Sequence, residues 1–284
     1  MANPQNAEIL LPRATLAGSL LFVSALAGCY WFFQSQLALA QAADSFMDVF
    51  TASVLMWTVH ISRQPQDKEH PFGHTRAQPI GALVTAVIAG VIAVEVGRSA
   101  LFALIEGAHP RLDYIMLAAF GGKVLFKGTV FVLSRNYGKS RPALRALAVD
   151  ARNDVLVGLL AVTGFFGATL GFEMLDAWLA LPIALWIGWS GVELARDNIR
   201  LLMGEAPDDE RQSQLEELAR QVPGVVAAHD LRAHFLGTQL HVHVHIVVDP
   251  NLSLKQAHDI GEAVRQKIED QPDVAHCSTH IDIE

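Results

Sequence analysis

Residues 38–61 read ALAQAADSFMDVFTASVLMWTVHI, a mostly apolar stretch that carries Asp44 and Asp48 in its first half. A helix needs about 20 predominantly apolar residues to cross a bilayer, so this stretch predicts a membrane span. Five more stretches have a similar length and character: 14–33, 80–105, 112–134, 144–168 and 175–200. The sequence therefore predicts an all-α six-helix transmembrane bundle embedded in a lipid bilayer.

The composition and the distribution of charge support this division of the chain. Hydrophobic residues make up 51% and charged residues only 18% of the 284 residues, whereas soluble domains carry about 25% charged residues. The net charge of −8 falls wholly on residues 206–284, because residues 1–205 hold 15 basic and 15 acidic side chains. We predict a transmembrane domain at 1–205 and an acidic cytoplasmic domain at 206–284. The acidic balance excludes a basic nucleic-acid face, and two cysteines make no disulfide framework.

The loops between the spans predict the orientation. Basic residues gather in the second and fourth loops, while the loops on the opposite side contain only Arg111. The basic set is Arg63, Lys68, Arg76, Arg135, Lys139, Arg141 and Arg145. Because basic loops stay on the cytoplasmic side, both termini are expected in the cytoplasm.

Two pairs of carboxylates lie where lipid is expected. Asp44 and Asp48 in the second span, and Asp150 and Asp154 in the fifth, are each four residues apart and share one helix face. An ionised aspartate at mid-membrane costs at least about 2.5–3.5 kcal/mol. Either each pair lies in a wet cavity or caps a shorter helix, or all four converge on one divalent cation. Because a carboxylate must lose its proton to bind a metal, the second interpretation predicts metal exchange for protons.

An enzyme is a different possibility for such a site. An intramembrane metallohydrolase would use carboxylate-bound metal to activate water, and it would need a separate general base. No polar residue beside either pair offers one in the sequence, so we predict that the protein is no enzyme.

The loop before the third span contains Asp67, His70 and His74 at spacings of three and four residues. One carboxylate and two imidazoles form a compact set of ligands for a metal ion. The alternative is an ordinary solvated polar loop.

The sequence of the C-terminal domain predicts helices and strands in the order α-β-β-α-β. This domain also carries eight of the twelve histidines. His241, His243 and His245 alternate with valines and therefore share one face of a strand. The remaining candidate ligands come from other elements: His229, His258, His280 and Asp282. Such a face is either a metal cluster or a pH-sensitive solvated surface. His276 and Cys277 point to opposite faces and are assigned no role.

The chain resembles the cation diffusion facilitator family of metal/proton antiporters, and its bacterial ferrous-iron/zinc efflux branch in particular. The resemblance rests on the Asp pairs, on the loop from Asp67 to His74, and on four tail motifs. These motifs are APDDER at 206–211, HDLR at 229–232, QAH at 256–258 and the terminal HID at 280–282.

The resemblance implies a homodimer in the inner (plasma) membrane, with a ferredoxin-like cytoplasmic domain and metal ions and protons as substrates. It implies a transport site at Asp44, Asp48, Asp150 and Asp154, and an inner-loop site at Asp67, His70 and His74. It also implies a binuclear cytoplasmic site, which zinc suits, at His229, His245, His258, His280 and Asp282. His241 and His243 are additional to this pattern.

One residue departs from the zinc exporters of that family, which usually have a histidine where this chain has Asp150. Zinc favours nitrogen and sulfur ligands, whereas harder ions suit an all-oxygen site. We therefore expect Fe(II), Mn(II) or Co(II) ahead of Zn(II) and Cd(II). A zinc exporter of the same family and a non-transporting metal sensor remain alternatives.

Overall fold

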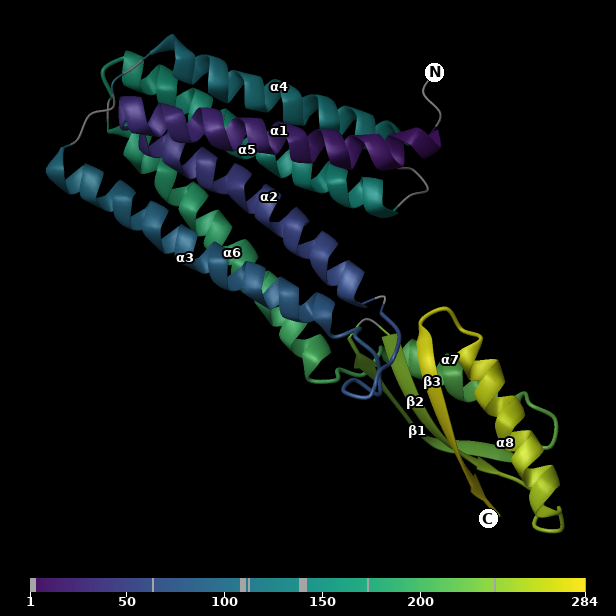
Figure 1. The fold of residues 1–284 in the computed structure, drawn as a ribbon. Coiled ribbons are helices and arrows are strands. Elements are labelled where there is room, and N and C mark those ends of the chain that lie inside the picture. The colour runs from purple at the N-terminus through teal and green to yellow at the C-terminus, as the bar shows by residue number, and fades with distance from the viewer. Residues whose placement is uncertain are drawn as a thin grey trace. The chain divides into compact units, whose positions relative to one another are not determined.

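The computed structural model describes residues 4–62, 64–107, 111, 113–137, 142–172, 174–237 and 239–283. Its N-terminal part consists of six long helices (Figure 1): α1 (Pro4–Phe33), α2 (Gln36–Ser62), α3 (Ala77–Glu106), α4 (Tyr114–Tyr137), α5 (Pro142–Thr169) and α6 (Leu175–Leu202). Each corresponds to one predicted span. Arg63, Lys139 and Arg141, on which the predicted orientation partly depends, lie outside the described residues.

Five of these helices are long and apolar enough to cross a membrane, and α2 is the exception among the described helices. Polar side chains such as Gln41 and Ser45 accompany its two aspartates. At its N-terminus, Asp176 of α6 accepts hydrogen bonds from the backbone N–H of Gln36 at 2.5 Å and from the Ser35 hydroxyl at 2.6 Å. A carboxylate is favoured at a helix N-terminus, so this buried contact fixes where α2 begins.

Helices α4 and α5 approach closely because Gly158 of α5 has no side chain at their contact. A Cβ atom on Gly158 would lie 2.6 Å from Cγ2 of Val124 in α4. The buried core of this region includes Leu26, Phe120 and Phe165. The close approach brings long side chains of α4 within reach of the polar face of α5.

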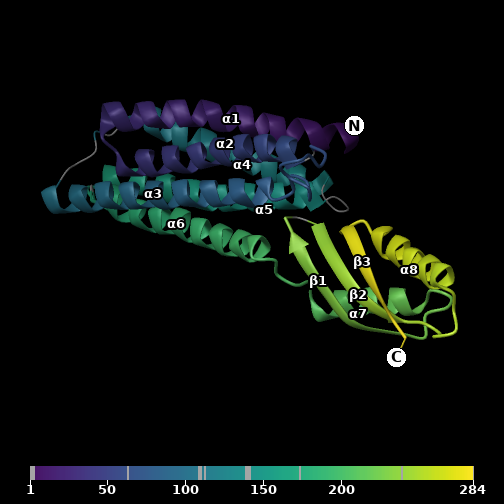
Figure 2. The same ribbon diagram turned by 60° about the horizontal axis from the view of Figure 1, so that its bottom comes forward.

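The C-terminal domain is a three-stranded sheet covered on one face by two helices (Figure 2). Its elements are α7 (Asp209–Arg220), β1 (Ala227–Leu236), β2 (Gln239–Val247), α8 (Leu254–Glu269) and β3 (Val274–Asp282). The strand order is β1-β2-β3, with β1 antiparallel and β3 parallel to β2. Asp208 caps α7, and Ser253 forms a capping box with Gln256 at the start of α8. The predicted α+β fold of ferredoxin-like type is confirmed.

The helices cover the face of β2 that carries Val242, Val244 and Ile246, all buried in the domain core. His241, His243 and His245 therefore point to the opposite, uncovered face, as the alternation along the strand predicts. The domain thus separates a hydrophobic core on one side of the sheet from an imidazole-bearing face on the other.

A β-bulge in β1 places further histidines on that uncovered face. His229 pairs with His245 and Arg232 with His243, so three steps along β1 match two along β2. Asp230, within this bulge, has a positive φ of 46°. The extra residue reverses the alternation, and His229 and His234 consequently face the same side although five residues separate them.

The described chain forms two compact units. One unit comprises 1–54 and 84–194; the other comprises Leu55–Leu83 and Ala195–Glu284. In the second unit, the loop between α2 and α3 contacts the β1–β2 turn. The Thr75 hydroxyl donates a hydrogen bond to the Leu236 carbonyl at 2.8 Å, and a Cβ on Gly237 would lie 2.5 Å from the Thr75 backbone. The loop therefore rests directly on the sheet domain.

Candidate metal centres

The structure brings together three of the four predicted transport-site carboxylates. Ligand atoms of Asp48, Asp150 and Asp154 all lie within 4.8 Å of one another, close enough to hold one metal ion. Asp48 comes from α2, and the other two from successive turns of α5. Asp44, one turn before Asp48, lies outside this group. Oxygen ligands alone favour harder divalent cations, although the role of these residues as ligands stays a prediction.

Two lysines of α4 lie among these carboxylates. Lys123 and Lys127 are fully buried at 0% exposure. The Lys123 Nζ lies 2.8 Å from Oδ2 of Asp44, and the Lys127 Nζ lies 2.7 Å from Oδ2 of Asp48. Lys127 also forms an ion pair with Asp154. A buried charge must be paired and hydrogen-bonded to be tolerated, so the lysines and aspartates stabilise one another.

The two lysines are polar neighbours of the aspartate pairs that the sequence analysis did not single out. Lys123 and Lys127 are four residues apart and project from one face of α4. Placing two charged lysines within an apolar span costs as much free energy as placing the aspartates there. Their position within the fourth apolar stretch could therefore have marked the two lysines as functional candidates from the sequence alone. Their charges also change the electrostatics, because four carboxylates and two ammonium groups leave a formal −2 when all are ionised.

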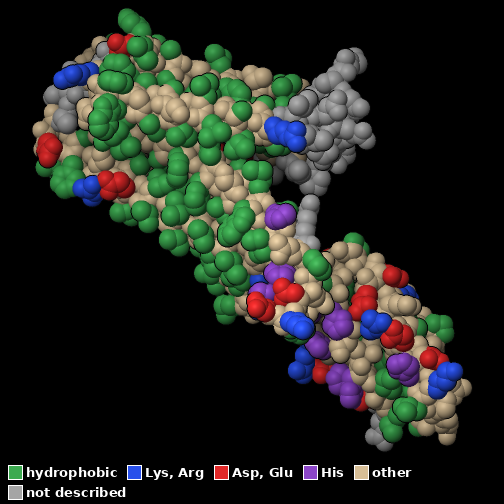
Figure 3. Space-filling model, in the orientation of Figure 1, with side chains coloured by type: hydrophobic (Ala, Val, Ile, Leu, Met, Phe, Trp, Pro, Cys, Tyr) green, Lys and Arg blue, Asp and Glu red, His purple; other side chains and the backbone are tan. Residues whose placement is uncertain are grey.

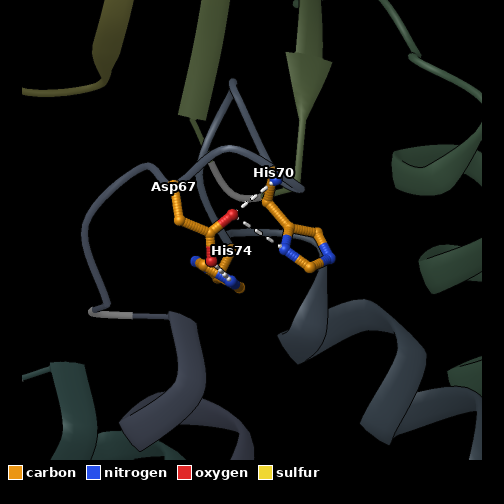
Figure 4. A group of neighbouring side chains, drawn as sticks. All are labelled: Asp67, His70 and His74. Atoms are coloured by element: carbon orange, nitrogen blue, oxygen red, sulfur yellow. Dashed lines mark hydrogen bonds and ion pairs between the residues drawn. The ribbon is translucent and has the colours of Figure 1, made fainter.

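The inner loop folds around Asp67, His70 and His74 (Figure 4). One carboxylate oxygen of Asp67 accepts hydrogen bonds from the backbone N–H of His70 at 2.6 Å and of Glu69 at 2.9 Å. These bonds, the His70 N–H first, lower the pKa of Asp67. Gly73 adopts a positive φ of 81° and turns the chain back towards His74.

The three side chains of this loop converge. His70 Nδ1 lies 3.2 Å and His74 Nε2 lies 3.5 Å from the Asp67 carboxylate, and the two rings are 4.5 Å apart. His74 is largely buried, and its Nδ1 has no hydrogen-bond partner among the described residues. The predicted trio thus meets the geometry of a metal site.

In the sheet domain, four of the five predicted ligands meet at one end of the uncovered face. Asp282 Oδ2 lies 3.0 Å from His245 Nδ1 and 3.5 Å from His229 Nε2, while Asp282 Oδ1 lies 3.3 Å from His280 Nε2. His229, His245 and Asp282 satisfy the spacing of a metal site. His258 lies exposed on α8 and outside this group.

A second set of histidines, unassigned by the sequence, lies at the other end of the same face, and Figure 3 shows how histidines gather over this domain. His241 pairs in register with His234 of β1 and with His276 of β3. It is buried at 9% exposure. Burial and then the neighbouring imidazoles lower the pKa of His241. The bulge that aligns this set has no signature in the sequence pattern.

Two family models match the chain and together cover most of it. The model for the cation efflux transmembrane domain matches residues 13–203. The model for the cation efflux protein cytoplasmic domain matches residues 207–284.

Curated relatives match along nearly the whole chain. The cation-efflux pump FieF of Cronobacter sakazakii is 30% identical, with 90% of this chain and 85% of the relative covered. Metal tolerance protein C1 of Arabidopsis thaliana is 30% identical over 87% of this chain and 56% of its own length. Among solved structures, a cadmium form of a MamM CTD variant is 28% identical over 27% of this chain and 96% of its own, with a TM-score of 0.26. The chain belongs to the cation efflux family, the cation diffusion facilitators, and is a membrane transporter of divalent metal cations rather than an enzyme.

Proposed function

We propose that this transporter exports a divalent transition-metal ion from the cytoplasm in exchange for protons. It works as a homodimer in the inner membrane, with both termini in the cytoplasm. The observation that carries the proposal is the meeting of Asp48, Asp150 and Asp154 inside a helical bundle, within 4.8 Å of one another. A carboxylate binds metal only when deprotonated, so binding and proton release are coupled at this site.

Lys127 adds a step to this exchange. Its ammonium pairs with Asp48 and Asp154, two members of the carboxylate group. A metal ion bound by these carboxylates replaces the ammonium as their counter-charge. Lys127 therefore competes with the metal, which weakens retention of the ion. Lys123 stands in the same relation to Asp44.

The all-oxygen donor set determines the expected preference among ions. Carboxylates suit Fe(II), Mn(II) and Co(II) better than an ion that favours nitrogen or sulfur. The printed names of relatives agree with efflux and metal tolerance without naming an ion. The inner-loop and sheet-domain groups contain imidazoles and suit zinc, so transport and cytoplasmic sites are proposed to prefer different metals. A zinc exporter with the same site is the alternative.

The test uses purified protein in sealed vesicles, with a metal-sensitive dye and a pH-sensitive dye trapped inside. Asp154→Ala should abolish both metal flux and metal-driven proton movement. Glu95→Gln is the matched control, because it removes an exposed carboxylate of α3 that pairs only locally with Arg98, and it should behave as the wild type. Normal exchange by Asp154→Ala would refute the carboxylate site.

The same vesicles separate this proposal from a non-transporting sensor. A sensor binds metal in its cytoplasmic domain and moves none across the membrane. Metal flux by the purified wild-type protein therefore excludes the sensor, and its absence would support it.

A further inference from the structure

Two rows of histidines cross the uncovered face of the sheet. The first row, His229, His245 and His280, belongs to the group that contains Asp282. The second row consists of His234, His241 and His276, which are also register partners on β1, β2 and β3. Each row places one imidazole on every strand of the sheet.

We propose that the second row binds one divalent cation of the zinc class, Zn(II), Co(II), Ni(II) or Cu(II), through its three imidazoles. This site goes beyond the proposed transport function and does not depend on it. Three nitrogen donors favour these borderline ions over Mg(II), Ca(II) and Mn(II).

The ring spacings fit shared coordination. A zinc–nitrogen bond is about 2.0–2.1 Å long, so two imidazoles on one tetrahedral ion have ring centres about 5.2 Å apart. In the second row the centres lie 6.1 Å apart for His234–His241 and 5.7 Å for His241–His276. In the first row the corresponding spacings are 5.5 and 4.6 Å. Both neighbouring pairs in the second row therefore lie within about 1 Å of that spacing, and His234 and His276, which are two strands apart, turn towards His241 to share one ion.

The orientation of His276 supports a ligand role. The Glu269 carboxylate at the end of α8 lies 3.2 Å from Nδ1 of His276. Metal-binding histidines commonly direct their second ring nitrogen to a carboxylate, which fixes the tautomer and leaves the other nitrogen for the metal. Here that arrangement leaves Nε2 of His276 available.

The second row opens onto a cavity of about 760 Å³ in the unit formed by the sheet domain and the inner loop. His234, His241, His243 and His276 line it from the sheet, and His70 and His74 line it from the loop. The Phe72 ring lies 5.8 Å from that of His241 and shields it from water. The cavity leaves room for a fourth ligand, either His243, whose ring lies 6.4 Å from that of His234, or a water molecule.

The rival interpretation is a solvated surface that gains protons as the pH falls. His241 is poorly placed for that role, because it is buried and faces His234, His243, His276 and Arg76. In this cluster, protonation of one imidazole makes protonation of the next one less favourable, because the positive charges repel each other. A divalent cation bound to neutral imidazoles avoids this repulsion, since all three rings share a single ion.

The test is a count of bound Zn(II) on the full-length protein purified in detergent. The protein is loaded with Zn(II), desalted and analysed for metal per chain. His241→Gln and, separately, His276→Gln should each lose about one equivalent relative to the wild type. His276 is exposed at an edge strand, so its substitution keeps the assay valid if His241→Gln misfolds. His60→Gln on α2 is the matched histidine control and should lose none.

A second readout locates the ion by residue. Zn(II) should protect His234, His241 and His276 from modification by diethylpyrocarbonate, measured by mass spectrometry in an Asp282→Ala background that disables the first row. Wild-type zinc content in both His241→Gln and His276→Gln, together with unprotected second-row histidines, would overturn the proposal.

Discussion

The Nζ atom of Lys127 lies 2.7 Å from Oδ2 of Asp48, and the same ammonium pairs with Asp154. One lysine of α4 thus joins carboxylates of α2 and α5 at the place where three carboxylates could hold a metal. The Lys127 ammonium and a metal ion therefore compete for the same carboxylate oxygen atoms. Several consequences of this competition can be measured.

Replacing Lys127 with Met keeps an unbranched side chain of similar size and removes its charge. We expect transport-site metal affinity to rise about tenfold, or about 1.4 kcal/mol, because the competing ammonium is gone. We also expect more protons to be released per metal bound, since protons take over as counter-charge. Isothermal titration in two buffers of different ionisation enthalpy measures both quantities.

Lys127→Arg is the control for that experiment, because it keeps the positive charge and should show neither effect. Weaker metal binding by Lys127→Met, with unchanged proton release, would mean that the lysine only holds the helices together.

Asp150→His tests the argument from ligand hardness. Introducing nitrogen into an all-oxygen site should raise Zn(II) flux relative to Fe(II) and Mn(II) flux. Uptake into vesicles is measured with Zn(II) and either Fe(II) or Mn(II) present together, which gives the ratio of the two fluxes. An unchanged ratio would remove the reason for preferring iron, manganese or cobalt.

Gly158→Ala tests the close approach of α4 and α5. The added Cβ would lie 2.6 Å from Val124, and such overpacking typically costs about 1–3 kcal/mol. Thermal unfolding in detergent should therefore occur at lower temperature, with weaker transport as Lys127 separates from Asp154. Gly121→Ala on α4 is matched, because nothing among the described residues lies within 4 Å of its Cβ, and it should be tolerated. Equal stability of both variants would argue against a tight α4–α5 contact.

Cys277 should be inert in the folded domain. Burial and then the Glu269 carboxylate raise the pKa of its thiol to about 12, whereas an unfolded cysteine titrates at about 8.5. The folded state thus keeps this proton at pH values where the unfolded state loses it, so stability falls as pH rises above about 8.5. In a Cys29→Ala variant, iodoacetamide at alkaline pH should label the protein only after denaturation. Rapid labelling of the native protein would contradict this.

Much of the fold is predictable from the sequence because its signals are local. Each of the six apolar stretches forms a helix, and the predicted α-β-β-α-β order of the C-terminal domain recurs as α7, β1, β2, α8 and β3. The inner-loop trio is also local, since Asp67, His70 and His74 lie within eight residues.

The remainder depends on contacts that no local pattern encodes. The bulge at Asp230 decides that His229 and His234 share a face, and simple alternation along β1 would separate them. Likewise, only the packing of α4 against α5, and the ion pair that Lys127 forms with Asp48 of α2, bring Lys127 to the aspartates. The sequence indicates that these charged residues lie within membrane spans. It does not indicate which residues they pair with, because the partners lie on other helices.

The central claim is that metal and protons exchange through this transporter. The most direct measurement imposes a pH gradient, acidic inside, across vesicles that contain the purified protein and equal Mn(II) concentrations on both sides. Antiport predicts that proton flow alone drives Mn(II) inward against its developing gradient, and that Asp154→Ala abolishes this accumulation. Metal that only equilibrates across the membrane, regardless of the pH gradient, would contradict the account.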